Sequence, residues 1–201
     1  MIRKYRVFCL AVLSRKYTDN ELYASSLQNI NIKDCQCPSC GQTGSLKKHA
    51  EYKRYLICNQ NGARKENVIN IVRFSCISCH KTHAYIPVFI IPFSVYSLRF
   101  ILNVLLYYFQ KKLTVESICH KFKISVSQLY KWLSLFKKCQ KKWICGMEEL
   151  LCLSVDKGNG IFLKFLNGML PEHFINYIAW DNLFFINYQH LFGKTFLENT
   201  C

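Results

Sequence analysis

The sequence predicts an α+β protein, in which a small β-hairpin with paired cysteines is followed by three helices and a short mixed C-terminal segment. Two Cys-x-x-Cys pairs, at 37–40 and 76–79, enclose two runs typical of strands. Apolar residues then recur at helical spacing between residues 98 and 136. We therefore expect four regions: an N-terminal segment of unknown role (1–30), the cysteine hairpin (31–88), the helical unit (93–138), and a basic linker with a C-terminal segment that could be a truncated domain (139–201).

The two cysteine pairs indicate a metal site. Each Cys-x-x-Cys forms a tight turn that directs two thiolates at one ion, and two such turns complete a tetrahedral shell. Four thiolates leave no open position for water, so the ion is predicted to be structural. Zinc is the expected cofactor, although iron would use the same ligands. The predicted metal ligands are Cys37, Cys40, Cys76 and Cys79.

Three neighbouring residues offer alternative ligands. Cys35 lies two residues before Cys37, but Cys-x-Cys spacing suits a tight turn less well. His80 and His83 follow the second cysteine pair. Because the four cysteines already complete the shell, we interpret both histidines as polar residues on a turn.

The residues between the cysteine pairs predict a hairpin. Leu46–Cys58 and Val68–Phe74 are expected strands, and the polar stretch 59–66 is expected to be the turn that joins them. This stretch contains Asn61-Gly62, a hairpin signal. Thr82–Ile86 is a candidate third strand. A hairpin that carries one cysteine pair at each end is a zinc ribbon.

Residues 86–109 are the most apolar stretch, and the alternatives are a membrane span and a buried helix. Arg99 lies inside the stretch, and an arginine at the bilayer centre costs about 2.5–3.5 kcal/mol. No uncharged run reaches about 18 residues. We expect no membrane association but an amphipathic helix with Ser94 as its N-cap. Its apolar face comprises Leu98, Ile101, Leu102, Leu105, Leu106 and Phe109.

Residues 113–133 predict a helix-turn-helix. Thr114 and Ser125 are N-cap residues, and Ser125-x-x-Gln128 is a capping box. Cys119 supplies the small buried residue that lets the second helix cross closely. Lys123 departs from the pattern, since many such turns carry glycine there. The second helix is expected to bury Leu129, Trp132, Leu133 and Phe136.

If the second helix lies in a DNA major groove, its outward N-terminal residues reach base edges. Glutamine suits adenine, lysine suits guanine, and valine can contact a thymine methyl group. Lysines around the helix would instead bind phosphates. The alternative is an ordinary pair of core helices with solvated lysines. The predicted DNA-binding residues are Val126, Ser127, Gln128, Tyr130, Lys131, Lys121, Lys123, Lys137 and Lys138.

The net charge of +15 favours a polyanionic partner, either nucleic acid or an anionic membrane surface. Twelve cysteines would suit a secreted disulfide scaffold, but the apolar run Val7–Leu13 is short for a signal peptide and leads directly into Ser14-Arg15-Lys16. A reducing cytoplasm, in which the remaining cysteines are free thiols, is the expected location.

The C-terminal third offers little support for catalysis. Asp156, Glu172, Asp181 and Glu198 could be proposed as carboxylates of a nuclease, but their spacing does not support this. No nucleotide-binding, hydrolase or zinc-protease motif occurs. The sequence therefore favours a protein that is not an enzyme.

The stretch of about residues 35–138 resembles the N-terminal part of bacterial insertion-sequence transposases. The resemblance rests on Cys37-Pro38-Ser39-Cys40-Gly41, the basic hairpin, the run from Val72 to His83, and the helices that follow Pro87. The stretch is still more similar to a related family of uncharacterised bacterial proteins with the same ribbon and a similar helical segment. The resemblance implies a metal-ligand role for the four cysteines and a recognition role for the helix from Val126, whereas the transposases' acidic triad has no counterpart here.

Three functions follow from these patterns. The first is a DNA-binding protein of transposase-derived or regulatory type with structural zinc and double-stranded DNA as partner. The second is a truncated or complete transposase or recombinase that uses Asp156 with Glu172 or Asp181. The third is a protein-interaction module. Whether the protein binds a palindromic site as a homodimer stays open.

Overall fold

The computed structural model describes residues 3–7, 18–28, 30–60, 62–87 and 90–139. The predicted C-terminal segment, including the four acidic residues considered above for a nuclease site, lies outside the described residues.

The described residues form a four-stranded sheet and four α-helices, which confirms the α+β class. The strands are β1 (Arg3–Val7), β2 (Leu46–Gln60), β3 (Ala63–Cys76) and β4 (Thr82–Pro87). They lie in the order β1-β4-β3-β2, with β2, β3 and β4 antiparallel and β1 parallel to β4. The predicted third strand is therefore confirmed as β4, whereas β1 was not predicted.

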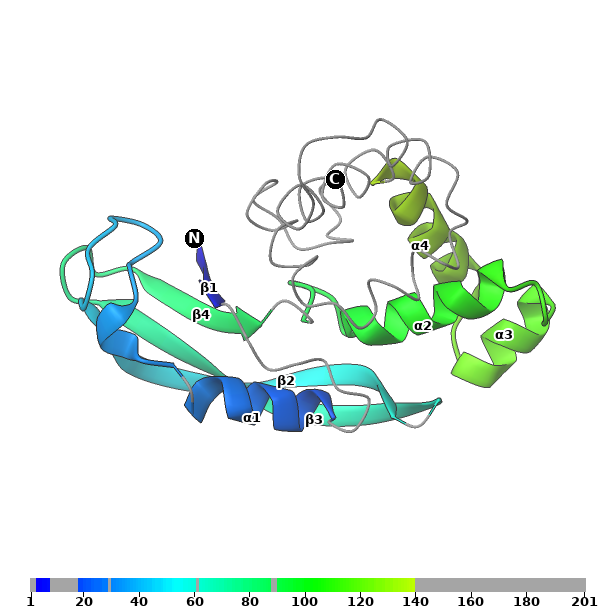
Figure 1. The fold of residues 1–201 in the computed structure, drawn as a ribbon, viewed down its shortest axis with the longest axis horizontal. Coiled ribbons are helices and arrows are strands. Elements are labelled where there is room, and N and C mark those ends of the chain that lie inside the picture. The colour runs from blue at the N-terminus through cyan, green and yellow to red at the C-terminus, as the bar shows by residue number, and fades with distance from the viewer. Residues whose placement is uncertain (1–2, 8–17, 29, 61, 88–89, 140–201) are drawn as a thin grey trace, which may run out of the picture.

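The β2–β3 hairpin runs along the described body, with the cysteine loops at one end and helices α2 and α3 at the other (Figure 1). The expected polar turn over 59–66 is wrong, because the strands continue to Gln60 and resume at Ala63. Asn59 pairs with Arg64 and Cys58 with Lys65 in the antiparallel ladder. Polar residues suit this end of the hairpin because one side faces water. Gly62, at φ +79°, permits the tight connection.

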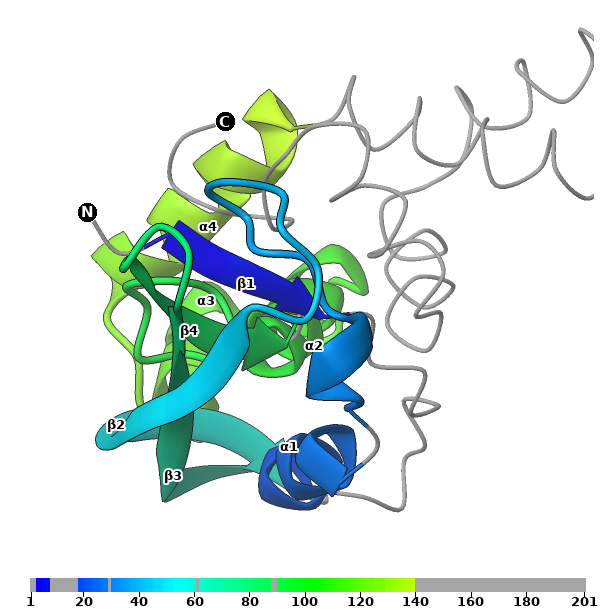
Figure 2. The same cartoon turned by 90° about the vertical axis from the view of Figure 1, so that its left-hand side faces the viewer.

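Helix α1 (Asp19–Gln28) lies in the segment to which the sequence assigned no role. Its start is a capping box: the Thr18 backbone N–H donates to Glu21 Oε2 at 2.6 Å, and the Glu21 N–H donates to Thr18 Oγ1 at 3.3 Å. Both views place α1 alongside the hairpin (Figures 1 and 2). Tyr23 Oη accepts the Val72 N–H at 2.9 Å, so α1 satisfies a backbone donor of β3.

A short 3₁₀-helix, η1 (Ile32–Asp34), leads from α1 to the first cysteine loop. The remaining helices are α2 (Leu98–Phe109), α3 (Val115–Phe122) and α4 (Val126–Lys138). In α2, Leu98, Ile101, Leu102 and Leu105 are buried, and Leu106 and Phe109 are partly buried against the same core, as the periodicity predicts.

The N-cap of α2 is Ser97, so the expectation of Ser94 is wrong. The Ser97 side chain accepts the Phe100 N–H, whereas Ser94 Oγ accepts the Tyr96 N–H. The reason is tertiary. Residues 95–97 dock along β2, where the Ile57 N–H donates to the Val95 carbonyl and the Ser97 N–H donates to the Ile57 carbonyl. The chain is therefore extended until Ser97 and cannot begin a helix earlier.

One apolar core connects the hairpin with the helices. Phe100 of α2 meets Phe122 of α3 and Trp132 of α4 edge to face, with ring centroids 5.8 and 6.2 Å apart. Leu56 and Ile57 of β2 belong to the same cluster. The helices are thus fixed relative to the sheet. In the described part of the chain, no helix has the length and apolarity needed to cross a membrane.

Candidate metal centre and helical surface

The two cysteine loops share one backbone pattern. In the first, the Gly41 N–H donates to the Cys37 carbonyl at 2.8 Å and the Cys37 N–H donates to the Gln42 carbonyl at 2.9 Å. In the second, the His80 N–H donates to the Cys76 carbonyl at 2.9 Å and the Cys76 N–H donates to the Lys81 carbonyl at 3.0 Å. Gly41 and His80 occupy the same loop position, and both have positive φ, +75° and +56°. Two loops of identical hydrogen bonding thus face each other.

The four predicted cysteines lie together. Their Sγ atoms are all within 4.8 Å of one another, and Cys37–Cys79 and Cys40–Cys76 are each separated by 3.7 Å. A tetrahedron of sulfurs about 2.3 Å from a zinc ion has edges of about 3.8 Å. A disulfide would require about 2.05 Å. All eight cysteines that the structure describes are free thiols. The spacing therefore fits a four-thiolate metal site; iron(II) or iron(III) would fit the same donors.

The surroundings of the sulfurs favour the thiolate at Cys76 and the protonated thiol at Cys40. The Ser45 hydroxyl, 3.2 Å from Cys76 Sγ, lowers the pKa of this thiol to about 5; the N–H groups of Cys79 and Ser78 act in the same direction, and burial opposes them. For Cys40, the Gln42 N–H lowers the pKa, but burial and the neighbouring thiols outweigh it and raise the pKa to about 11. Deprotonating all four thiols therefore costs substantial free energy unless a cation is bound.

The alternative ligands have different positions. Cys35 Sγ donates to the Asn31 carbonyl at 3.2 Å and is not part of the four-sulfur cluster. His80 lies on the second loop, as expected. His83, by contrast, is not on a turn: it belongs to β4, is fully buried, and its Nε2 lies 3.4 Å from Cys37 Sγ. In the tautomer with a proton on Nε2, His83 donates to this sulfur and orients it.

Helices α3 and α4 are joined by residues 123–125. Thr114 and Ser125 cap them as predicted, accepting the N–H groups of Ser117 and Gln128. Cys119 is buried, as expected of the small residue at the crossing. Lys123 adopts φ +49°, the left-handed conformation in which glycine is favoured. The lysine therefore stands where a glycine would be expected on physical grounds.

The predicted DNA-binding residues remain accessible. The four residues expected to be apolar on α4, Leu129, Trp132, Leu133 and Phe136, are buried, so the opposite face is presented to solvent. Gln128 is half-buried. The exposed residues are Val126, Ser127, Tyr130, Lys131, Lys121, Lys123, Lys137 and Lys138.

Among these lysines, Lys121 has a partner within the protein. Its Nζ donates to Tyr107 Oη at 3.1 Å and lies 4.2 Å from the centre of the Tyr107 ring. The ammonium group is thus held at the surface of the α2–α3 packing. Lys137 and Lys138 lie in the last turn of α4, about 17 Å along the axis from Val126.

Sequence reasoning missed two residues that shape these sites and misplaced a third. Ser45 immediately precedes β2 and contacts Cys76 of the second cysteine loop; no spacing signal marks it. His83 was noticed but assigned to a turn. Arg64, in β3, donates from Nη1 to the Lys123 carbonyl, a contact between residues 59 positions apart. Such long-range contacts leave no local pattern in a sequence.

The structure thus defines an α+β protein with a candidate four-cysteine metal centre and an exposed face on its last described helix. The chain belongs to the DUF6431 family, a domain of unknown function, whose model matches residues 25–132. This span includes the four cysteines and α4 as far as Trp132. No match was found among curated proteins or among solved structures.

Proposed function

We propose that this protein is a DNA-binding protein of transposase-derived or regulatory type, without catalytic activity of its own. In this proposal α3 and α4 act as a helix-turn-helix, α4 enters the major groove of double-stranded DNA, and the four cysteines bind a structural zinc ion in a ribbon.

The observation that carries the proposal is the division of α4 into two faces. One face is buried in the core, and the other presents Ser127, Lys131 and Tyr130 to solvent. The helix sequence, VSQLYKWLSLFKK, contains no acidic residue that would repel phosphate. A recognition helix needs an outward face of this kind, with donors and acceptors that match base edges and no negative charge.

Phosphate binding would come from lysines at both ends of α4. Lys123 lies in the turn before the helix, and Lys137 and Lys138 lie in its last turn. These two groups of lysines are about 17 Å apart along the helix, so they would contact phosphates that flank the groove. The residues in the first turns of α4, which lie between the two groups, would contact bases. The net charge of +15 supplies long-range attraction to DNA.

The metal ion would act on folding rather than on chemistry. Four thiolates complete its shell, so no position is left for a substrate. The hairpin leads from the cysteine loops to Arg64, whose hydrogen bond holds the turn before α4. A bound metal would therefore stabilise the hairpin on which the helices are seated.

The experiment is a binding assay with the full chain. Zinc per chain is measured first, and affinity for a random duplex is then measured at several salt concentrations. About one zinc ion per chain and an affinity that falls steeply with salt are expected, because each phosphate contact contributes about 0.9 to the slope of log K against log salt. A duplex selection then identifies the preferred site.

Variants separate base contacts from charge. Lys131→Ala and Gln128→Ala are expected to weaken binding to the selected site about 5- to 150-fold, because a good base contact contributes about 1–3 kcal/mol. Lys33→Ala is the charge-matched control, since Lys33 is exposed in η1 near the cysteine loops. Equal losses in Lys131→Ala and Lys33→Ala would show attraction by net charge only. Zinc binding without DNA binding would favour a protein-interaction module instead.

A further inference from the structure

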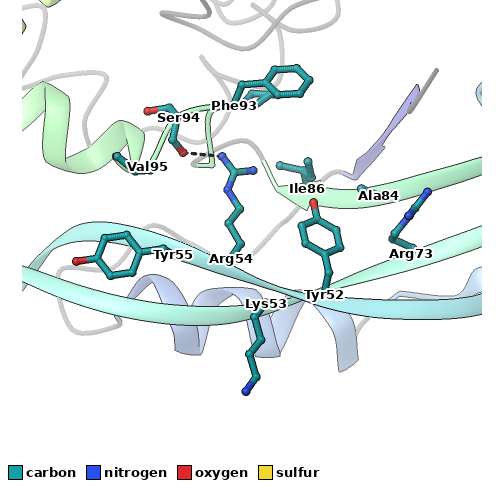
Figure 3. Close-up of a pocket in the computed structure, with 11 residues that line it drawn as sticks. Tyr52, Lys53, Arg54, Tyr55, Arg73, Ala84, Ile86, Phe93, Ser94 and Val95 are labelled. Carbon is teal, nitrogen blue, oxygen red and sulfur yellow. Dashed lines mark hydrogen bonds between the residues drawn. The ribbon is translucent and has the colours of Figure 1, made fainter.

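A groove lies between the sheet and the segment that leads into α2. It has a volume of about 560 Å³, within the range of about 300–1,000 Å³ typical of ligand sites. Figure 3 shows it on the face of the sheet opposite α1, with Tyr52 and Arg54 rising from β2 and Phe93, Ser94 and Val95 above them. The ammonium group of Lys53 points away from it (Figure 3).

The groove exposes aromatic surface on both walls. Tyr52 and Tyr55 of β2 are partly exposed, and Phe93 is 91% exposed. Exposed aromatic side chains that gather around one cavity are characteristic of binding sites. Val95, also exposed, extends the apolar surface beside them.

The backbone of Phe93 is strained in this exposed position. Its φ is +60°, a left-handed conformation that is rare for a bulky residue. The Arg54 guanidinium fixes the loop from below, donating to the Ile91 carbonyl at 2.5 Å and to the Ser94 carbonyl at 2.7 Å. The Ser94 N–H also donates to the Ile91 carbonyl at 3.2 Å. A strained backbone that exposes an aromatic ring indicates a functional constraint.

The charge of the groove is positive. Arg54 and Arg73 rise from the sheet into it, and none of the described residues that line it is acidic. Arg73 Nη2 donates to Thr82 Oγ1 at 2.5 Å, while its Nε is buried without a hydrogen-bond partner in the described residues. Aromatic walls with arginines between them match the two parts of a nucleotide, a flat base and an anionic phosphate.

The groove is separated from a second cavity, beside the N-terminal half of α4, by a shared wall. This second cavity, of about 190 Å³, is lined by Gln128 and Lys131 of α4 and by Trp132. Residues 93–95 line both cavities. The loop of residues 93–95 therefore stands between the groove and the two α4 side chains best suited to base contacts, Gln128 and Lys131.

We propose that this groove binds an unpaired nucleotide of a DNA strand whose duplex portion lies on α4. The base stacks on Phe93 or Tyr52, and Arg73 binds the adjoining phosphate. The inference rests on the proposed DNA binding and adds a preference for DNA with a duplex–single-strand junction. Charge favours this occupant over a second copy of the chain, since a self-association would bring Arg54 and Arg73 toward a surface equally basic.

The test compares a blunt duplex with the same duplex carrying a short oligothymidine extension, using the full chain. The extension is expected to raise affinity. Phe93→Ala and Tyr52→Ala are expected to remove at least about fivefold of that gain, the loss typical of one base–aromatic stack, with blunt-duplex affinity unchanged. Val68→Ala, which removes exposed apolar surface from β3, is the control and is expected to retain the gain.

A second measurement does not depend on variants. A 5-iodouracil in the extension is expected to photocrosslink to Phe93, Tyr52 or Tyr55 of the wild-type chain, located by mass spectrometry. Blunt-duplex binding with neither a gain from the extension nor a cross-link in the groove would overturn the inference and leave the proposed function standing. Absence of binding to either DNA would overturn both. A change of sedimentation mass in Phe93→Ala without an effect on the extension would assign the groove to self-association instead.

Discussion

Arg64 of the β2–β3 hairpin donates a hydrogen bond from Nη1 to the backbone carbonyl of Lys123, in the turn between α3 and α4. The same guanidinium forms an ion pair with Glu66 through Nη2, at 2.7 Å. The carbonyl at a left-handed residue points away from the helix and lacks an intrahelical partner, so Arg64 satisfies a group that the turn leaves free. The hairpin that carries the cysteine loops is thereby attached to the start of α4.

Replacing Arg64 with methionine is expected to lower the free energy of unfolding by about 1–2 kcal/mol, since a hydrogen bond from a charged group to a backbone carbonyl is lost. Amide hydrogen exchange should quicken around residues 123–126 and stay slow in the cysteine loops. Glu66→Gln is the control, because it removes the exposed ion pair and keeps the bond to Lys123. Equal effects of the two variants would show that Arg64 acts through Glu66.

Replacing Lys123 with glycine is expected to stabilise the protein. The lysine is held at φ +49°, where an L-residue is disfavoured by about 1–2 kcal/mol. Glycine removes this strain, but its greater conformational entropy in the unfolded chain offsets part of the stabilisation. A net gain of about 0.5–1 kcal/mol should appear in urea unfolding. Lys123→Ala removes the same charge and keeps the strain, so it should give no gain. A gain as large in alanine as in glycine would show that charge repulsion, and not the backbone, is relieved.

The Ser45 hydroxyl is expected to strengthen metal binding through Cys76. Because it holds the pKa of Cys76 at about 5, well below the usual value near 9.0, protons compete with a metal ion at this sulfur only in acid. Ser45→Ala raises that pKa, so the pH at which metal is lost should rise. Affinity near neutral pH should fall about 10-fold, the lower end of the effect expected for such a supporting group.

Chelator competition across a pH series measures this effect. Ser39→Ala is the matched control, because the Ser39 hydroxyl belongs to the first cysteine loop and has no hydrogen-bond partner among the described residues. The same shift in both variants would show that Ser45 does not act on Cys76 specifically. Cys76→Ser should abolish tight metal binding and unfold the end of the hairpin that carries the cysteine loops, visible as lost strand signal in circular dichroism.

Features with a local signature could be predicted from the sequence. The cysteine set follows from Cys-x-x-Cys spacing, and the buried faces of α2 and α4 follow from helical periodicity. Helix caps at Thr114 and Ser125 are likewise visible, because capping uses residues three positions apart. The start of α1 has the same kind of signal, Thr18-x-x-Glu21, but a weak apolar face and the charged segment before it concealed the helix.

Features decided by tertiary contacts could not be predicted. Ser94 and Ser97 are equally good N-caps by residue type, and only the docking of residues 95–97 on Ile57 selects Ser97. His83 reads as a turn residue because it closely follows a cysteine loop, yet β4 begins at Thr82 and buries it. The groove around Phe93 combines β2, β3, β4 and a loop, so no single stretch of sequence reveals it.

The ion pair between Asp19 and Arg99 fastens α1 to α2, and it too joins distant residues. Arg99 Nη1 lies 3.1 Å from Asp19 Oδ1, with both side chains largely buried. In the sequence, Arg99 is recognisable only as a charged residue that interrupts an apolar stretch. In the structure its partner, Asp19, lies 80 residues away. Removing one member of a buried pair leaves an uncompensated charge. Asp19→Ala is therefore expected to lower the free energy of unfolding by about 3–5 kcal/mol.

The double variant Asp19→Leu with Arg99→Met separates the cost of the orphaned charge from the value of the pair. It removes both charges and keeps apolar volume, so it should recover most of the stability that Asp19→Ala loses. Chemical denaturation of wild type, the single variant and the double variant measures this directly. A double variant as unstable as Asp19→Ala would mean that the pair itself, and not the avoidance of a buried unpaired charge, holds α1 against α2.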